Sequence, residues 1–186
     1  YEGRSAVHYA ALSGSPTLLS YTVSEYRLNA SQPDYKGVVP LALACVSGSI
    51  NAVEYIMNTT DTDIDVDITC NEGKTPLHYS CRHGNLELSQ YLCEVQGSGI
   101  TLDGAGYSIA SGNIKLNQYF IENHHLLLTP VSFLNAVNSS KLPLVKLLID
   151  EYKLDPHVKG KDGEGAVHFA AQTGVIDILE YLVNDC

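Results

Sequence analysis

The fold of this chain is decided by one stretch of sequence, Gly73-Lys74-Thr75-Pro76-Leu77-His78-Tyr79-Ser80-Cys81-Arg82-His83-Gly84. Thr75 offers a hydroxyl that can cap a helix, and Pro76 suits the first helical position, where a missing N–H costs nothing. Small residues at Ser80 and Cys81 allow a neighbouring helix to approach closely. Gly84 is suited to end the helix, because glycine adopts a left-handed conformation without steric cost. The stretch therefore predicts a short helix with a defined beginning and end.

The same pattern recurs along the chain. Residues 8–14, 42–48 and 168–174 align with 78–84, and each of these four copies has a second glycine at the same distance upstream, at Gly3, Gly37, Gly73 and Gly163. Two degenerate copies fill the long interval between the third and the last. The six copies close at one register position, which we call the anchor: Gly14, Gly48, Gly84, Gly112, Ser140 and Gly174.

A second helix is predicted after each anchor. In the third copy its apolar residues are Leu86, Leu88, Tyr91 and Leu92, which lie on one side at helical spacing. Neither helix of a copy can bury its apolar side alone. The core must therefore be formed by stacking one copy on the next, as in repeat proteins.

Residues 73–84 resemble the signature of the ankyrin repeat family, and residues 162–174 are similar to it. The resemblance implies an all-α, ankyrin-repeat solenoid of stacked helix-turn-helix units with β-hairpin loops. It covers essentially the whole chain, as a single domain over 1–186 with approximate repeats 1–34, 35–70, 71–100, 101–128, 129–160 and 161–186.

The fourth and fifth copies depart from the pattern. They lack the opening glycine in register and are shorter, so we expect their hairpin loops to be shortened or absent. Thr129-Pro130 lies two residues out of register with the fifth copy. The sequence leaves open whether that helix is longer or the unit irregular.

Composition limits the partners. The chain has 186 residues, 45% of them hydrophobic and 17% charged, with a net charge of -10. This composition argues against disorder, and the negative charge disfavours nucleic acid and anionic membranes while favouring a basic protein partner. No apolar stretch approaches the ~18 residues of a membrane span. Five cysteines without CxxC spacing indicate reduced thiols, so we expect a cytoplasmic protein.

The ends of the sequence suggest that more protein surrounds it. The chain begins without an initiator methionine, and neither terminal copy has a clearly polar outer face. We therefore expect a fragment of a longer protein, with further repeats or a docking domain beyond both ends.

Two groups of residues could bind a metal ion or take part in catalysis. The acidic run 61–72 has the spacing of an EF-hand calcium loop, although Val66 stands where that loop needs glycine, so calcium binding is a distant alternative. His8, His78 and His168 recur at one motif position, which favours a structural role over catalysis. By resemblance to the ankyrin family, this histidine ties one repeat to the next through hydrogen bonds. No catalytic, phosphate-binding or dinucleotide motif is present, so we predict no enzyme activity, no cofactor and no metal.

The resemblance implies a protein or peptide partner on the concave face formed by first helices and hairpin tips. We also expect the chain to be a monomer. The position after the motif histidine is aromatic in four of the six copies, and such side chains are frequent in binding hot spots. The sequence does not decide whether this aromatic row is exposed or part of the core. The predicted contact residues are Tyr9, Leu12, Ser13, Asp34, Tyr35, Leu43, Val46, Asn71, Glu72, Tyr79, Arg82, His83 and Phe169. The alternative is a structural spacer that contacts only flanking repeats or domains.

Overall fold

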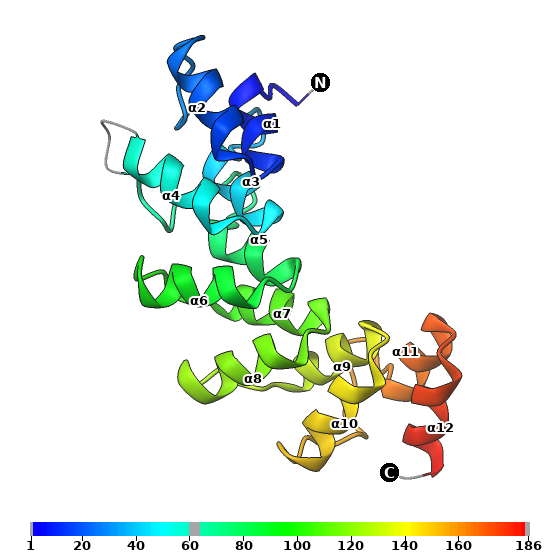
Figure 1. The fold of residues 1–186 in the computed structure, drawn as a ribbon. Coiled ribbons are helices and arrows are strands. Elements are labelled where there is room, and N and C mark those ends of the chain that lie inside the picture. The colour runs from blue at the N-terminus through cyan, green and yellow to red at the C-terminus, as the bar shows by residue number, and fades with distance from the viewer. Residues whose placement is uncertain (1, 60–63, 185–186) are drawn as a thin grey trace. The chain divides into compact units, whose positions relative to one another are not determined.

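The computed structural model describes residues 2–59 and 64–184, and every named element in these ranges is an α-helix. The chain forms two compact units, residues 1–100 and 101–186 (Figure 1). The first contains α1 (Ala6–Leu12), α2 (Pro16–Ser24), α3 (Pro40–Ser47), α4 (Ile50–Thr59), α5 (Pro76–Arg82) and α6 (Leu86–Glu94). The second contains α7 (Leu102–Ser111), α8 (Ile114–Asn123), α9 (Pro130–Asn138), α10 (Leu142–Asp150), α11 (Ala166–Thr173) and α12 (Ile176–Asn184). The all-α arrangement of helix pairs is confirmed, while the single domain with the repeat boundaries given above stays a prediction.

In the first unit, α3 packs between α1 and α5, and each first helix also packs on the second helix of its own copy (Figure 1). The core comes from corresponding positions of successive copies, such as Val7, Leu41 and Leu77 on the first helices and Leu19 and Val53 on the second. Most of these side chains are wholly buried. Burial is thus supplied by the neighbouring copy, as the repeat pattern predicts.

The second unit repeats this arrangement. There α9 packs between α7 and α11, and α10 contacts both α9 and α12. Its largest wholly buried side chains are Phe120 and Phe133. A buried polar link joins α7 to α8, because the Ser108 hydroxyl donates to Asn117 Oδ1 at 2.9 Å and Asn117 Nδ2 donates to the Ser108 carbonyl at 3.1 Å.

All six anchors turn the chain through a left-handed residue. Their φ angles are +70° at Gly14, +77° at Gly48, +70° at Gly84, +70° at Gly112, +61° at Ser140 and +72° at Gly174. At Gly14 a Cβ atom would also lie 2.9 Å from Ser47 Oγ, so the turn requires glycine for space as well as conformation. Ser140 is the exception, and it adopts the same left-handed turn with a side chain.

The helix starts explain the irregular fifth copy. Thr129 caps α9 by accepting from the Ser132 N–H at 3.2 Å, and Thr101 caps α7 by accepting from the Gly104 N–H at 3.2 Å. Measured from their anchors, both caps lie two residues earlier than Thr75 does in the third copy. The helices are correspondingly longer, with 9 residues in α9 and 10 in α7 against 7 in α5. The Thr129-Pro130 pair therefore marks a longer helix.

The loops between copies have two lengths. Residues 25–39 and 151–165 form long loops, whereas 95–101 and 124–129 are short, as expected for the fourth and fifth copies. The long loops turn tightly, with Asp34 N–H donating to the Val38 carbonyl at 2.9 Å and Gly160 N–H to the Glu164 carbonyl at 2.7 Å. The β-pairing in these loops is short. Within the described residues it consists of one antiparallel bridge, between Lys159 and Gly165, and no extended strand forms.

Candidate functional site

The motif histidines hold the starts of α1, α5 and α11, and His8 also reaches the next copy. The His8 ring accepts from Ser5 N–H at Nδ1 (3.1 Å), and its Nε2 donates to the Val38 carbonyl of the second copy at 3.1 Å. Thr75 N–H similarly donates to His78 Nδ1 at 3.0 Å. Burial lowers the pKa of His8, which favours the neutral ring that this pair of bonds requires. These contacts give the histidine the structural role expected from its recurrence.

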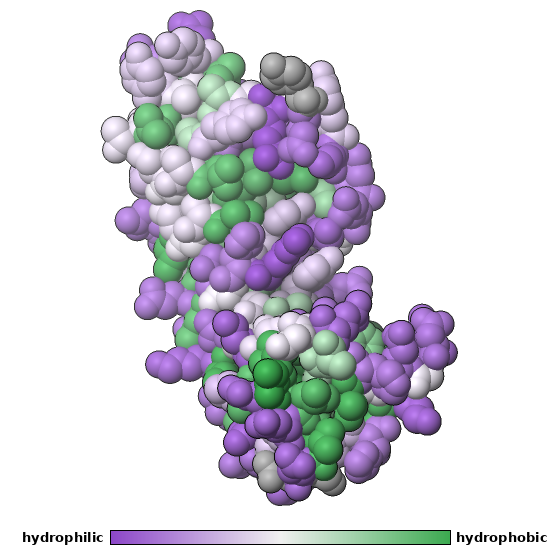
Figure 2. Space-filling view, turned by 90° about the vertical axis from the view of Figure 1, so that its right-hand side faces the viewer, coloured by the Kyte–Doolittle hydropathy of each residue, from purple (hydrophilic) through white to green (hydrophobic). Residues whose placement is uncertain are grey.

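The last turns of α1, α3 and α5 present one row of side chains in register. Leu12 and Arg82 are exposed and Val46 is half-buried. The next register position adds Ser13, Ser47 and His83. Because α1, α3 and α5 pack side by side, these side chains form a continuous surface on the first unit. Figure 2 shows hydrophobic residues grouped on the side of this unit that carries its first helices.

The side chain that follows the motif histidine is exposed to different degrees in different copies. Tyr9 is 60% exposed, whereas Leu43 at the same register is only 4% exposed. Tyr79, Tyr107 and Phe169 are half-buried. The prediction that Leu43 contacts a partner is therefore wrong, because α3 is packed between two first helices and its Leu43 side chain lies in the core.

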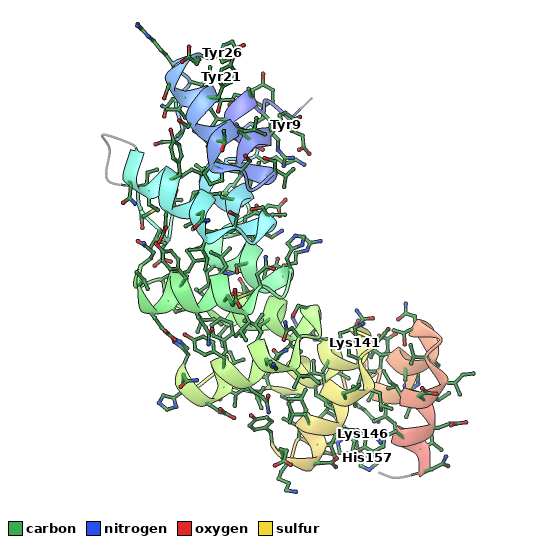
Figure 3. The ribbon with its side chains drawn as sticks, viewed as in Figure 1. Tyr9, Tyr21, Tyr26, Lys141, Lys146 and His157 are labelled. Carbon is green, nitrogen blue, oxygen red and sulfur yellow. The ribbon has the colours of Figure 1, made fainter. Side chains whose placement is uncertain are left out.

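Tyr9 remains available for a partner. It projects from α1 on the side away from Tyr21 and Tyr26, whose rings meet edge to face with centroids 5.7 Å apart (Figure 3). Tyr79 is more restrained, since its hydroxyl donates to Cys70 Sγ at 3.6 Å. Burial also raises the pKa of the Tyr79 hydroxyl. Phe169 lies on α11, which belongs to the second unit, whereas the row lies on the first.

The prediction that Asp34 contacts a partner is also wrong, because its side chain turns into the loop and is buried. It accepts from the N–H groups of Lys36 at 2.8 Å and Val38 at 2.9 Å, and from Arg4 Nε at 3.2 Å. Burial opposes the charged form, but these donors outweigh it and hold the pKa of Asp34 below its ordinary value. Asp34 thus shapes the loop that presents Tyr35 and does not face a partner.

The loop tips are fixed to one another along the first unit. Tyr35 N–H donates to the Glu2 carbonyl at 2.9 Å, and Asn71 N–H donates to the Lys36 carbonyl at 2.9 Å. Asn71 Nδ2 also donates to the Tyr35 carbonyl at 3.1 Å. Tyr35, Asn71 and Glu72 are exposed on this ordered edge.

The carboxylates at this edge have partners within the chain. Glu2 pairs with Lys36 and Arg4, and Glu72 pairs with Lys74. Hydrogen bonds from the two lysines are the main cause of the lowered pKa values of Glu2 and Glu72. The negative charges of Glu2 and Glu72 are therefore locally neutralised.

The predicted residues that the structure brings together on the first unit define what we call the interaction face: Tyr9, Leu12, Ser13, Tyr35, Val46, Asn71, Glu72, Tyr79, Arg82 and His83. Ser47 lies outside the predicted set, although the register places it between Ser13 and His83 in the same row.

The calcium alternative is only partly covered by the described residues, since Asp61 and Asp63 lie outside them. Of the rest, Asp65 accepts from Asp67 N–H at 2.9 Å, Asp67 accepts from the Ser98 hydroxyl, and Glu72 is paired with Lys74. In residues 2–59 and 64–184, no three His, Cys, Asp or Glu side chains form a group that could hold a metal.

An apolar cavity of about 210 Å³ lies in the first unit beside residues 64–68, lined by Val39, Leu41, Ile64 and Ile68 among others.

None of the described helices has both the length and the apolar character needed to cross a membrane.

Comparison with known families gives two matches. Residues 7–103, more than half of the chain, match a family model described as ankyrin repeats (3 copies). Residues 133–183 match a second model, described as ankyrin repeats (many copies). A search of curated proteins found no match.

Proposed function

The chain belongs to the ankyrin repeat family, and from this premise we propose that it is a non-catalytic module that binds a protein or peptide on the interaction face of its first unit. Ankyrin repeats are generally protein–protein interaction modules. The observation that carries the proposal is the register-matched row of Leu12, Val46 and Arg82, flanked by exposed Tyr9 and Tyr35.

The composition of this face supports protein recognition. Tyrosine and arginine are enriched at binding hot spots, and Leu12 and Val46 supply apolar area between them. The backbone beneath is ordered by the His8 link and by the hydrogen bonds between loop tips. A face that is ordered before binding loses less conformational entropy when the partner docks.

The net charge of the chain bears on the kind of partner that it binds. The net charge of -10 supports a basic partner through long-range attraction, which raises the association rate. Glu2 and Glu72 are already paired within the chain, so we expect contacts at the face itself to be aromatic, apolar and hydrogen-bonded. We further propose that the module acts as a monomer in the cytoplasm.

The test is capture of partners by three forms of the full chain. The Tyr9→Ala/Tyr35→Ala double variant should lose the proteins that the unsubstituted chain retains. Tyr26→Ala is the matched control, because Tyr26 is as exposed as Tyr9 but lies outside the interaction face. Equal retention by the double variant and the control would overturn the proposed face.

A structural spacer is the second candidate, and one observation favours it. The last copy exposes apolar side chains of α11 and α12, among them Val167 and Ile176, of the kind that contact a neighbouring copy elsewhere in the chain. A spacer would retain no protein on the interaction face in the capture experiment.

A further inference from the structure

The second unit contains a groove between α7 and α9, two helices that lie side by side (Figure 1). Two hollows between them, of about 260 and 310 Å³, have Asp103, Gly106 and Asn135 in common, so they form one continuous groove. We call it the α7–α9 groove. All the described residues that line it belong to the second unit. It therefore has no residue in common with the interaction face.

The groove is open at a position where the fourth copy departs from the motif. Since Gly112 corresponds to Gly14, Gly106 stands at the register position of His8. In the first copy the His8 ring occupies this position and reaches the next copy. At Gly106, the nearest described side chain that an added Cβ atom would meet is Asn135, whose Nδ2 lies 3.9 Å away. The absence of a side chain at Gly106 thus leaves room between the two helices.

The shortened loops give this groove an apolar end. Leu102 directly follows the first short loop, and Leu127 lies in the second. Both line the groove together with Val131, and the three side chains are 71%, 65% and 56% exposed. Large apolar side chains that line one hollow and still face water are typical of a surface that a partner covers.

Two polar side chains in the groove have unused hydrogen-bonding capacity. Among the described residues, neither the Asp103 carboxylate nor the Asn135 side-chain amide has a hydrogen bond or ion pair. Asp103 is exposed and Asn135 is half-buried. None of the described residues that line the groove is basic. The groove therefore offers a negative charge and an amide group that can both donate and accept.

These features fit an extended peptide better than a helix. The backbone of an extended segment has free N–H and C=O groups, with which the Asn135 amide can exchange hydrogen bonds. In a helix these groups are already paired internally. The Asp103 carboxylate is complementary to a basic side chain, and the net charge of -10 attracts a basic segment over longer distances.

We propose that the α7–α9 groove binds an extended peptide segment of a protein partner in which an apolar residue lies close to a lysine or arginine. The apolar side chain covers Leu102, Leu127 and Val131, and the basic side chain pairs with Asp103. The peptide backbone exchanges hydrogen bonds with Asn135. This second site does not depend on what binds the interaction face.

A phage library of short random peptides, selected on the full chain, is the probe. The selected peptides are then passed over Gly106→Leu, whose added side chain should fill the groove. Leucine favours a helix more than glycine does, so this variant should keep the fold, which its melting temperature checks. We call the peptides that the unsubstituted chain retains and Gly106→Leu loses the groove peptides. We expect each of them to combine an apolar residue with a lysine or arginine.

Charge reversal at Asp103 tests the predicted ion pair. Asp103→Lys should raise the dissociation constant of a groove peptide by about tenfold or more, because it places like charges together. Asp177→Lys is the matched control, since Asp177 is also exposed and lies in the first turn of α12 as Asp103 lies in that of α7. Both substitutions change the net charge equally. The control should raise the dissociation constant by about twofold or less, through long-range repulsion alone. Fluorescence anisotropy of a labelled groove peptide measures both effects.

Four results would overturn the proposal. Gly106→Leu could retain every peptide that the unsubstituted chain retains, or the peptides that it loses could lack basic residues. Asp103→Lys and Asp177→Lys could weaken binding equally. Finally, the Tyr9→Ala/Tyr35→Ala variant could lose the groove peptides, although we expect it to keep them. They would then bind the interaction face, and the α7–α9 groove would not be a separate site.

Discussion

The first and last copies carry nearly the same motif in different surroundings. Val7 and His8 are wholly buried, whereas Val167 and His168, at the same register, are exposed. Both histidines accept a hydrogen bond from the residue three positions before them, but only His8 reaches a carbonyl of the next copy among the described residues. The comparison shows that a side chain's burial is decided by its neighbouring copy, and substitutions at matched register positions can test this.

The largest contrast is expected between Leu43→Ala and Tyr9→Ala. Leu43 is enclosed between α1 and α5, so its truncation should lower the free energy of unfolding by about 2–4 kcal/mol through lost burial and a cavity. Tyr9 occupies the same register but is exposed, so its truncation should cost about 0.5 kcal/mol or less. Urea unfolding of both variants gives the two values. Equal losses would mean that the cost of truncation depends on the register position of a residue and not on the neighbouring copy that packs against it.

The same pair shows how far the sequence could predict the structure. The six anchors, including Ser140, and the shortened loops follow from residue spacing, because left-handed turns and helix caps are set locally. Leu43 was misplaced because packing against α1 is not a local property. Asp34 was misplaced because the N–H groups that draw its carboxylate inward belong to the loop's own backbone, whose course the composition does not reveal.

The next contrast is between His8→Ala and His168→Ala. The first substitution removes the bonds to Ser5 and Val38 and leaves a buried space, so we expect a loss of about 1–3 kcal/mol. The second removes one exposed bond, to Gly165 N–H, and should cost under about 1 kcal/mol. Thermal and urea unfolding measure both. A larger loss in His168→Ala than in His8→Ala would contradict the link between copies as the source of the difference.

A smaller effect is expected from pH, through the same histidine. Burial lowers the pKa of His8 in the fold, whereas the unfolded chain binds its proton near the ordinary value of about 6.5. The stability that neutral His8 provides is therefore present above about pH 6.5 and is lost as the pH falls below it.

Urea midpoints at pH 7.5 and pH 5.5 test this expectation. The midpoint should fall between these values in the unsubstituted chain and fall less in His8→Ala. Over this range Glu2 and Asp34, whose pKa values are lowered, stay ionised and contribute little to the slope. An unchanged slope in His8→Ala would show that other groups cause the pH dependence.

The smallest effect concerns the anchors, where the fifth copy differs from the first. Ser140 adopts φ of +61° with a side chain, a conformation that glycine adopts without steric strain, as Gly14 does at +70°. Ser140→Gly should therefore raise the free energy of unfolding by about 0.5–1 kcal/mol. Ser139→Gly should lower it, because Ser139 has φ of -68° and its hydroxyl donates to the Ala136 carbonyl at 2.7 Å. If both variants lose stability, Ser140 contributes contacts that outweigh its backbone strain, and the anchor of the fifth copy is not equivalent to that of the first.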